Sequence, residues 1–358
     1  MQRVDAGEGA AGIRRSTRVW GPSGMEDTRT MSVIENSKLA IVGAGAVGTS
    51  LAYAALIRES AREVALYDIN STKVAAEVLD LAHGTQFTGA SRVTGGDDLD
   101  VVRDANVVVI TAGARQHPGQ SRLEMAGVNV EILRDLMPKL VERAPDAIFV
   151  LVTNPVDVLA VAAQQFSGLP PARVFGSGTV LDSSRLRWML SERVGVAISN
   201  VHALIVGEHG DSEFPLWSQA RIGPISLADW MLARSADSSA SSPGAVPFTE
   251  AEFESIAEDV KNAAYRVIEG KGATNYAIGL SGARIVEAIL RDEGAILPVS
   301  SVLTDYRGVS GVALSVPSVI DASGIARVID VPFSPKEQAL FEHSAATLRA
   351  SLDTLGLA

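Results

Sequence analysis

Residues 43–48, Gly-Ala-Gly-Ala-Val-Gly, have the spacing of a turn that binds a dinucleotide. They follow a short apolar run and open a predicted helix, whose first N–H groups and positive dipole end favour phosphate. Gly43 and Gly45 allow a tight turn and close approach of the backbone to a pyrophosphate, and Gly48 lets helix and strand pack closely. Val47 lies in the same turn and is expected at the cofactor site. A purely structural glycine turn is the alternative.

Asp68 favours the cofactor interpretation. It ends the next predicted strand, 20 residues after Gly48. A carboxylate there can accept hydrogen bonds from both ribose hydroxyls of NAD and would repel the 2′-phosphate of NADP. Ile69 and Asn70 follow without a cation that could neutralise that phosphate. The turn, the helix and Asp68 together predict NAD as the cofactor.

Four polar segments interrupt apolar surroundings, at residues 112–123, 152–157, 178–185 and 206–211. The first two begin where predicted strands end, which is where ligands bind in doubly wound sheets. In this order the segments resemble the lactate/malate dehydrogenase family, and its lactate branch in particular. The resemblance covers residues 38–358 and depends on several independent motifs.

The reaction implied by the resemblance adds a hydride to the carbon of a 2-oxo acid and a proton to its oxygen. His209 is the expected proton donor, because imidazole titrates near neutrality. Asp182 would orient the histidine and stabilise its charged form, with a helix cap as the alternative. Arg185 shares a helix face with Asp182, and its planar fork would hold the substrate carboxylate. A surface salt bridge is the alternative for Arg185.

Further site residues follow from the resemblance alone. Arg122 lies in a loop that closes on substrate in the family, where this arginine polarises the carbonyl. Asn154 would bond the nicotinamide ribose or the region of the substrate hydroxyl. Thr274 matches a pocket residue near the substrate methyl group, and Ile278 would pack against the nicotinamide ring. An exposed loop arginine and a turn asparagine are the alternatives for the first two.

Gln116 indicates which substrate the site accepts. It lies two residues before the Pro-Gly of the loop, where malate-type members have an arginine that neutralises the second carboxylate of oxaloacetate. A glutamine would leave that carboxylate unpaired in a closed site, so the residue predicts pyruvate and L-lactate. Arg115 is adjacent, and a register shift would reverse the prediction. Malate dehydrogenase or another L-2-hydroxyacid dehydrogenase is therefore the alternative, and a nonenzymatic NAD-binding protein is the alternative from a different class.

Arg187 and His202 match positions that bind effector phosphates in some bacterial lactate dehydrogenases. In those enzymes fructose 1,6-bisphosphate binds across a subunit interface. Two copies of each residue would make a small basic cavity in an otherwise acidic protein. The resemblance therefore implies activation by this effector and a homotetramer, and ordinary polar interface residues are the alternative.

The first half of the chain must position these groups through alternating strands and helices. Short, continuously apolar strands of this kind indicate a parallel sheet covered on both faces. We expect an α/β fold with a doubly wound Rossmann domain that binds NAD over residues 37–177. The predicted strands are 39–42, 63–68, 92–94, 106–111, 147–153 and 173–175, and the predicted helices are 47–57, 71–81 and 123–143.

Residues 178–358 have a different rhythm and predict a mixed α+β catalytic domain with antiparallel strands. Residues 235–248 are rich in Ser, Ala, Gly and Pro and are interpreted as a flexible insertion. Ser334, Pro335 and Glu337 predict a capping box at the start of the last helix. The predicted helices are 181–194, 250–269 and 276–292, and the predicted strands are 201–206, 296–302, 312–316, 318–320 and 325–328.

Composition limits the partners. The chain has 358 residues, roughly two domains, and a net charge of −11, which argues against binding to nucleic acid or an anionic membrane. It has no cysteine, which excludes disulfides and thiolate metal sites, and no metal is expected. No apolar run approaches the roughly 20 residues of a membrane-spanning helix, and no signal peptide is recognised. We expect a cytoplasmic protein with a mobile tail over residues 1–36.

Overall fold

The computed structural model describes residues 36–114, 122–230 and 249–358. Three predictions therefore lie outside the described residues: the tail up to residue 35, the loop position Gln116, and the insertion at 235–248. Among the described helices, none has the length and the apolar character that crossing a membrane requires.

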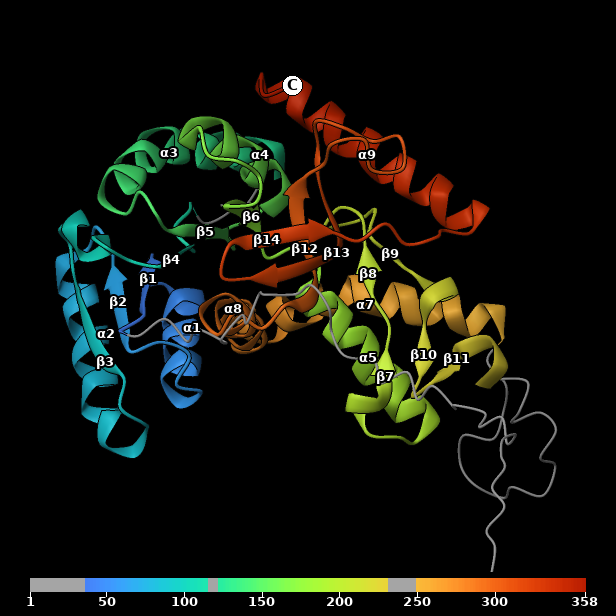
Figure 1. Ribbon diagram of the computed structural model, residues 1–358, viewed down its shortest axis with the longest axis horizontal. Coiled ribbons are helices and arrows are strands. Elements are labelled where there is room, and N and C mark those ends of the chain that lie inside the picture. Colours follow the sequence, from blue (N-terminus) through green and yellow to red (C-terminus); the bar gives the residue numbers. More distant parts are fainter. Residues whose placement is uncertain (1–35, 115–121, 231–248) are drawn as a thin grey trace, which may run out of the picture. The chain divides into compact units, whose positions relative to one another are not determined.

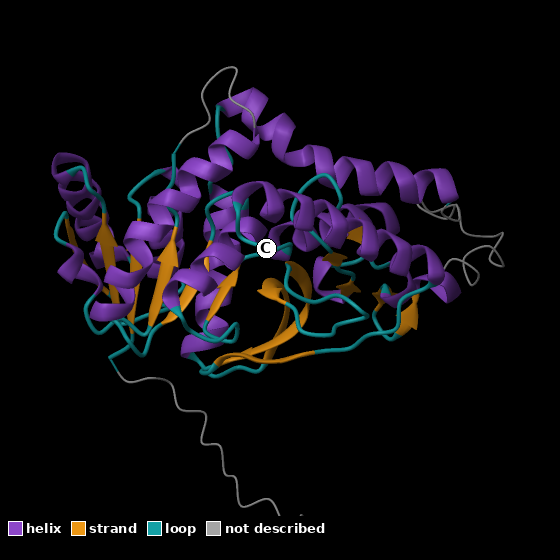
Figure 2. Ribbon diagram, turned by 90° about the horizontal axis from the view of Figure 1, so that it is seen from above, coloured by secondary structure: helices purple, strands orange, loops and turns teal. Residues whose placement is uncertain are grey.

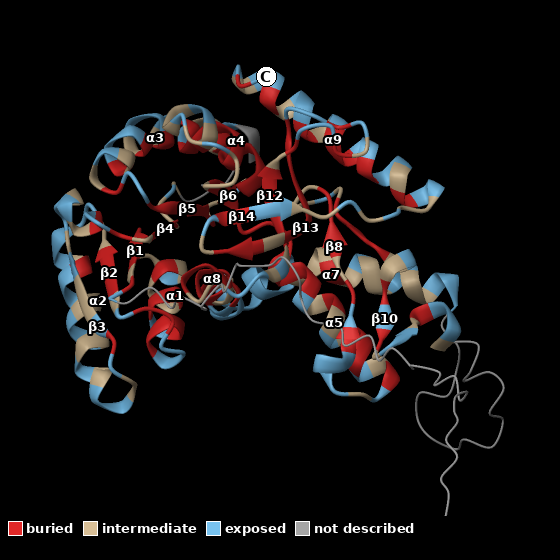
Figure 3. Cartoon of the chain, in the orientation of Figure 1, coloured by how far each residue is buried: buried red, intermediate tan, exposed pale blue. Residues whose placement is uncertain are grey.

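Apart from the edge strand at Arg92–Gly96, the strands of the first half are buried on both faces, because their side chains alternate between two hydrophobic clusters. In β1 (Lys38–Val42), Ala40 and Val42 belong to one cluster, whereas Leu39 and Ile41 belong to the other. Figure 3 shows buried residues concentrated along the central strands. This alternation explains why the strands are apolar throughout rather than at every second residue.

In the described part of the chain, one nine-stranded sheet has the order β14-β13-β12-β6-β5-β4-β1-β2-β3. The six strands of the first half pair in parallel, and their order reverses at β1, as in a doubly wound sheet. The predicted Rossmann arrangement is therefore confirmed. Besides β1, these strands are β2 (Glu63–Tyr67), β3 (Arg92–Gly96), β4 (Val107–Ile110), β5 (Ile148–Leu151) and β6 (Val174–Gly176).

Helices cover both faces of this sheet, as Figures 1 and 2 show. On one face α1 (Ala46–Ile57) packs along α8 (Tyr276–Leu290). On the other face α3 (Arg122–Arg143) packs along α4 (Val156–Ser167), and α9 (Pro335–Leu355) adds Phe341 and Leu348 to the same cluster. Helix α2 (Ser71–Gly84) lies beside β3. Segments far apart in the sequence therefore share each hydrophobic layer.

The antiparallel strands of the second half are confirmed, and the last three of them join the parallel sheet instead of forming a sheet of their own. β12 (Ala295–Val302) pairs with β6, where Ser300 lies opposite Gly176. β13 (Ala313–Asp321) and β14 (Gly324–Val328) follow in antiparallel order. One sheet therefore runs through both halves of the chain, and this pairing fixes their relative position.

Three details differ from the sequence prediction. Residues 201–206 form two strands instead of one, because β7 (Val201–His202) pairs with β10 (Arg221–Ile222) and β8 (Ile205–Val206) pairs with β9 (Phe214–Pro215). The strands predicted around Pro317 are one strand, β13, since Pro317 lies opposite Pro298 and a non-hydrogen-bonded pair needs no N–H. Helix α4 has no counterpart in the prediction, because its first eight residues are all buried and show no polar face.

Two helices of the second half begin and end close to their predicted limits. They are α5 (Val180–Val194) and α7 (Glu250–Lys271). The capping box of α9 is confirmed, since Ser334 Oγ accepts a hydrogen bond from the Glu337 N–H and the Glu337 carboxylate accepts one from the Ser334 N–H.

A substitution in the hairpin between β13 and β14 tests the close contact between the two halves. Gly324 has φ +92°, and a Cβ there would lie 2.1 Å from the Ala172 carbonyl oxygen. We expect Gly324→Ala to lower the free energy of unfolding by about 2–4 kcal/mol, measured by denaturant melting. Gly168→Ala is the control, because Gly168 also has a positive φ but open space around a Cβ, and it should cost about 1 kcal/mol. Equal losses would contradict the close contact.

Candidate active site

The glycine turn joins β1 to α1 and leaves the start of the helix open. A Cβ on Gly48 would lie 1.9 Å from the Gly43 carbonyl oxygen, and one on Gly43 would lie 2.7 Å from the Ala112 nitrogen. A Cβ on Gly45 would meet nothing within 4 Å, and no side chain caps α1. The turn therefore presents bare backbone at the N-terminus of a helix, an arrangement that fits a pyrophosphate.

Asp68 lies beside this turn, directly after β2. Its Oδ2 accepts a hydrogen bond from the Ala44 N–H at 2.8 Å, and its Oδ1 accepts one from the Asn70 N–H at 3.0 Å. A cavity of about 1000 Å³ runs past Gly43 and Asp68 toward Gly113. Each carboxylate oxygen keeps a further lone pair for a ribose hydroxyl. The residues present therefore fit the adenosine half of NAD.

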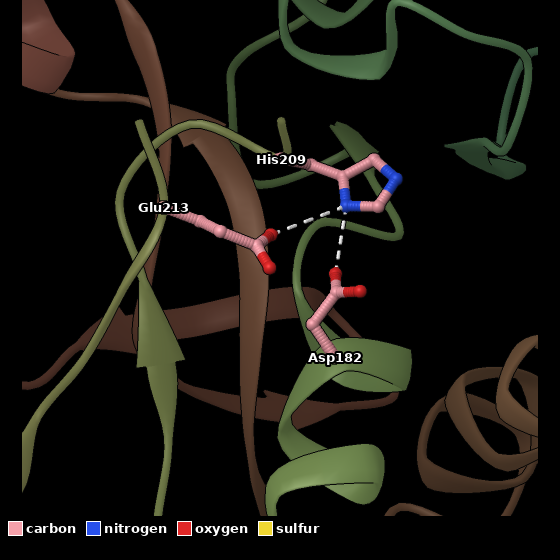
Figure 4. A group of neighbouring side chains, drawn as sticks. All are labelled: Asp182, His209 and Glu213. Atoms are coloured by element: carbon pink, nitrogen blue, oxygen red, sulfur yellow. Dashed lines mark hydrogen bonds and ion pairs between the residues drawn. The ribbon is translucent and has the colours of Figure 1, made fainter. Parts of the chain in front are cut away.

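His209 and Asp182 form the centre of the second group (Figure 4). The distance from His209 Nδ1 to Asp182 Oδ2 is 2.7 Å, and the other oxygen of Asp182 accepts a hydrogen bond from Arg185 Nη1 at 2.5 Å. Asp182 lies in the first turn of α5, whose N-cap residue is Thr179. Its carboxylate is therefore shared by a histidine and an arginine and does not cap the helix.

This pairing sets the charge state of the histidine. Burial alone would lower the pKa of His209, but the Asp182 carboxylate and then Glu213 outweigh it, so the pKa lies well above its usual value. Burial would raise the pKa of Asp182, but the charges of His209 and Arg185 lower it. An imidazolium beside a carboxylate is therefore the favoured state at neutral pH. About a quarter of the His209 side chain is exposed, which leaves the ring accessible.

Glu213 is a second carboxyl group on the same side of the ring (Figure 4). Its Oε2 lies 3.8 Å from His209 Nδ1, and burial together with the charge of Asp182 raises its pKa to about 7. The ligand atoms of Asp182, His209 and Glu213 lie within 4.8 Å of one another, which would suit a metal ion, but Asp182 already engages Nδ1. Glu213 is not among the residues predicted from the sequence, where its only signal is its position four residues after His209.

The loop that carries His209 is held by three other elements. The His209 N–H donates to Asp157 Oδ2 of α4 at 2.6 Å, and the Glu208 N–H donates to Ser344 Oγ of α9 at 2.7 Å. Gly207 pairs with Ser315 of β13 through two backbone hydrogen bonds of 3.0 and 2.8 Å. The loop is therefore fixed at the histidine and over the two residues that precede it.

Asn154 follows β5 and is exposed. Its carbonyl oxygen accepts a hydrogen bond of 2.9 Å from the Nδ2 of Asn129, a buried residue of α3. Asn129 Oδ1 accepts a second hydrogen bond, of 2.8 Å, from the Ala114 N–H. Asn129 thus joins the two chain segments that follow β4 and β5. Asn129 is not among the residues predicted from the sequence, although an amide on the apolar side of a helix is a signal of such a role.

The structure describes the surroundings of two of the remaining predicted residues, Thr274 and Ile278, but not those of Arg122 and Gln116. Thr274 is half-buried between α7 and α8, and Ile278 in the first turn of α8 packs against the cluster beneath α1. Arg122 is the first residue of α3, and only its backbone is described. Gln116 lies outside the described residues, so its part in the site stays a prediction.

The two predicted effector residues lie close together. Arg187 on α5 donates a hydrogen bond of 2.9 Å from Nε to the carbonyl oxygen of Ala203. The preceding residue, His202, is exposed on β7, directly opposite Arg221 of β10. Arg187 is therefore bonded to the residue that follows His202 in the chain.

Comparison with known proteins supports both the fold and the site. A family model for the lactate/malate dehydrogenase NAD-binding domain matches residues 37–176, and one for the α/β C-terminal domain matches residues 179–356. An L-lactate dehydrogenase from Bifidobacterium animalis subsp. lactis is 50% identical over 325 residues, covering 91% of this chain and 99% of that protein. An L-lactate dehydrogenase from Gloeobacter violaceus is 44% identical over 329 residues, covering 92% of this chain and 96% of that protein.

Two solved structures are also similar. MGS-M5, a lactate dehydrogenase from a Medee basin deep-sea metagenome library, has a TM-score of 0.84 and 36% identity over 90% of this chain and 99% of its own. The minor L-lactate dehydrogenase from Enterococcus mundtii, in its ligands-bound form, has a TM-score of 0.82 and 39% identity over 89% of this chain and 98% of its own. With both family models matched over nearly all the described residues, the chain belongs to the lactate/malate dehydrogenase family.

Proposed function

We propose that this chain is an NAD-dependent L-lactate dehydrogenase, which reversibly reduces pyruvate to L-lactate. The observation that carries the proposal is the hydrogen bond between His209 and a buried Asp182 that also binds Arg185. This arrangement provides a proton donor and a cation for a carboxylate on one side of the sheet. The 50% identity to an L-lactate dehydrogenase over 91% of the chain supports it.

The chain's own residues would bind the substrate and supply its proton. The cavity beside Gly43 and Asp68 would hold the cofactor, which in its reduced form, NADH, would supply the hydride for the keto carbon. His209 donates the Nε2 proton to the carbonyl oxygen, because Nδ1 is engaged by Asp182. In the reverse direction neutral His209 accepts the proton of the hydroxyl group. Asp182 stabilises the imidazolium form before reduction and orients the ring afterwards.

Arginines would hold the substrate. Arg185 uses Nη1 for Asp182, and its remaining N–H groups can hold the carboxylate of pyruvate. We assign the polarisation of the carbonyl to Arg122, the contact with nicotinamide ribose to Asn154, and the apolar contacts of the substrate methyl and nicotinamide to Thr274 and Ile278. Of these residues, Asn154 directly follows β5, and Arg122 begins α3, the helix that follows β4 in the sequence.

The proposal also includes the division into two domains, the effector, the oligomeric state and the location in the cell. The NAD-binding part would span residues 37–177 and the catalytic part residues 178–358. Fructose 1,6-bisphosphate would activate the enzyme by binding at Arg187 and His202, and the assembly would be a homotetramer, as the family resemblance implies. The homotetramer and the cytoplasmic location stay predictions.

Asp182→Asn tests the charge state of the histidine. The Asp182 carboxylate raises the pKa of His209, so the histidine of the wild type is already protonated at neutral pH. The rate of pyruvate reduction therefore declines only as the pH rises through that raised pKa. Without the carboxylate the pKa falls, so the decline should begin at lower pH, and kcat/KM for pyruvate at pH 7 should fall about 100-fold or more. The measurement is kcat/KM against pH. Asp229→Asn, at an exposed residue bonded to Ser226, is the control, and an unchanged alkaline decline in Asp182→Asn would refute the assignment.

Gln116→Arg tests the substrate. The new cation would neutralise the second carboxylate of oxaloacetate, so the ratio of kcat/KM for oxaloacetate to that for pyruvate should rise at least about tenfold. Arg115→Gln is the matched control and should leave the pyruvate preference in place. If the wild type prefers oxaloacetate and Arg115→Gln abolishes that preference, the alternative of malate dehydrogenase is correct.

Fructose 1,6-bisphosphate tests the effector site. Its addition should lower the half-saturating concentration of pyruvate, because the effector would favour the form that binds substrate. The double variant Arg187→Gln, His202→Gln should lose this response and retain activity at saturating pyruvate. Fructose 6-phosphate, with one phosphate, is the control ligand. An unchanged saturation curve of the wild type at neutral pH would remove this part of the proposal.

A further inference from the structure

Asp157 is a buried carboxyl group that the proposed reaction leaves without a role. It is the second residue of α4, its side chain is nearly inaccessible, and it belongs to the polar segment 152–157. Its Oδ2 accepts a hydrogen bond of 2.6 Å from the backbone N–H of His209, 52 residues away. Asp157 Oδ1 and the hydroxyl of Ser300 on β12 are both buried and make no hydrogen bond within the described residues.

A carboxyl group buried at this position lowers the stability of the fold, so its presence indicates a role other than packing. Its neighbours on α4, from Val158 to Ala163, are apolar and buried, so a side chain needed only for packing would be apolar too. Burial raises the pKa of Asp157 to about 7, with Ser300 and His209 opposing the rise only in part. Burial of a carboxyl group costs free energy unless hydrogen bonds in the protein offset that cost. Among the described residues, the polar groups that face the Asp157 carboxyl are the backbone N–H of His209, which donates a hydrogen bond to it, and the hydroxyl of Ser300.

The hydrogen bond from the His209 N–H to Asp157 restricts the position of the histidine. Asp182 on α5 holds the imidazole at Nδ1, and Asp157 on α4 holds the backbone nitrogen of the same residue. With the backbone and one ring nitrogen both fixed, few positions remain for Nε2, the atom that delivers the proton. Helix α4 also begins two residues after Asn154, so one short segment supports the histidine and carries the predicted ribose contact.

We propose that Asp157 is a positioning residue, which fixes the backbone of His209 so that Nε2 is aligned with the substrate oxygen. This inference depends on the proposed function, because it assumes that His209 delivers a proton. Displacement of a catalytic group by about 1 Å can cost on the order of 100-fold in rate, so one backbone hydrogen bond is sufficient to matter. The effect should appear in the chemical step and leave the binding of NADH unchanged.

Asp157→Ala and Asp157→Asn form the test. The alanine variant loses the acceptor, so kcat for pyruvate reduction should fall about 10- to 100-fold, while KM for pyruvate stays within about threefold. The asparagine variant keeps an acceptor oxygen and can offer its NH₂ group to Ser300, so kcat should stay within about threefold of wild type. Rates are expressed per NADH-binding site, counted by fluorescence titration, so that misfolded protein does not contribute. The solvent deuterium isotope effect on kcat should increase in Asp157→Ala only.

Glu287→Ala is the matched control for the loss of a buried acid. Glu287 is 2% exposed and lies near the C-terminal end of α8, where it binds Arg58 and Ser60 just beyond the C-terminal end of α1, the end away from the glycine turn. This variant should lower the melting temperature yet keep kcat within about twofold of wild type. If Asp157→Ala yields no folded protein, Asp157→Ser is measured instead, since its shorter side chain also withdraws the acceptor.

The outcomes separate the inference from the proposed function. A wild-type chain that reduces no 2-oxo acid with NADH would refute the function itself. With an active wild type, the inference fails if Asp157→Ala, or its serine substitute, keeps kcat within twofold. It also fails if Asp157→Asn is as slow as the alanine variant, or if Glu287→Ala shows an equal loss and an equal isotope effect. A slow alanine variant, a near-normal asparagine variant and an active control support it.

Discussion

The buried carboxylate of Asp182 is the interaction on which the site depends. A lone negative charge in this position would be expensive, and three features compensate for it: the imidazolium of His209, the guanidinium of Arg185 and the positive end of the α5 dipole. Removal of either cation would leave the buried negative charge of Asp182 only partly compensated. The same charge keeps the histidine protonated at neutral pH, so the stability of the site and its reactivity have one cause.

The continuous sheet makes this interaction useful. The glycine turn and Asp68 lie at the carboxyl ends of β1 and β2, whereas the loop bearing His209 is bonded to β13 in the second half. Because β12 pairs with β6, hydrogen bonds running through the sheet join the two groups. A flexible connection between separate sheets would let the histidine move relative to the cofactor. Here the relative position of the two is set by the register of strands.

The sequence predicts best what depends on neighbouring residues. The glycine turn, the three-residue spacing of Asp182 and Arg185, and the capping box of α9 are local, and the structure has each of them. Helix α4 was missed because its first eight residues are buried and almost all apolar, and such a run, directly after a predicted strand, cannot be told from a buried strand by its pattern. Asn129, Asp157 and Glu213 were missed because their meaning lies in partners that tertiary structure brings together. The joining of the antiparallel strands to the parallel sheet has no local signal either, since strand partners are chosen across the whole chain.

The hydrogen bond between Glu208 and Ser344 has a consequence for the order in which the protein is made. Ribosomes build chains from the N-terminus, and 136 residues separate the loop that carries the histidine from the α9 hydroxyl that holds it. A nascent chain therefore exposes His209, with Asp157 already synthesised to hold its backbone, well before the Ser344 hydroxyl exists. The support from α9 is the last of the three to form, because it requires the final helix to emerge and dock.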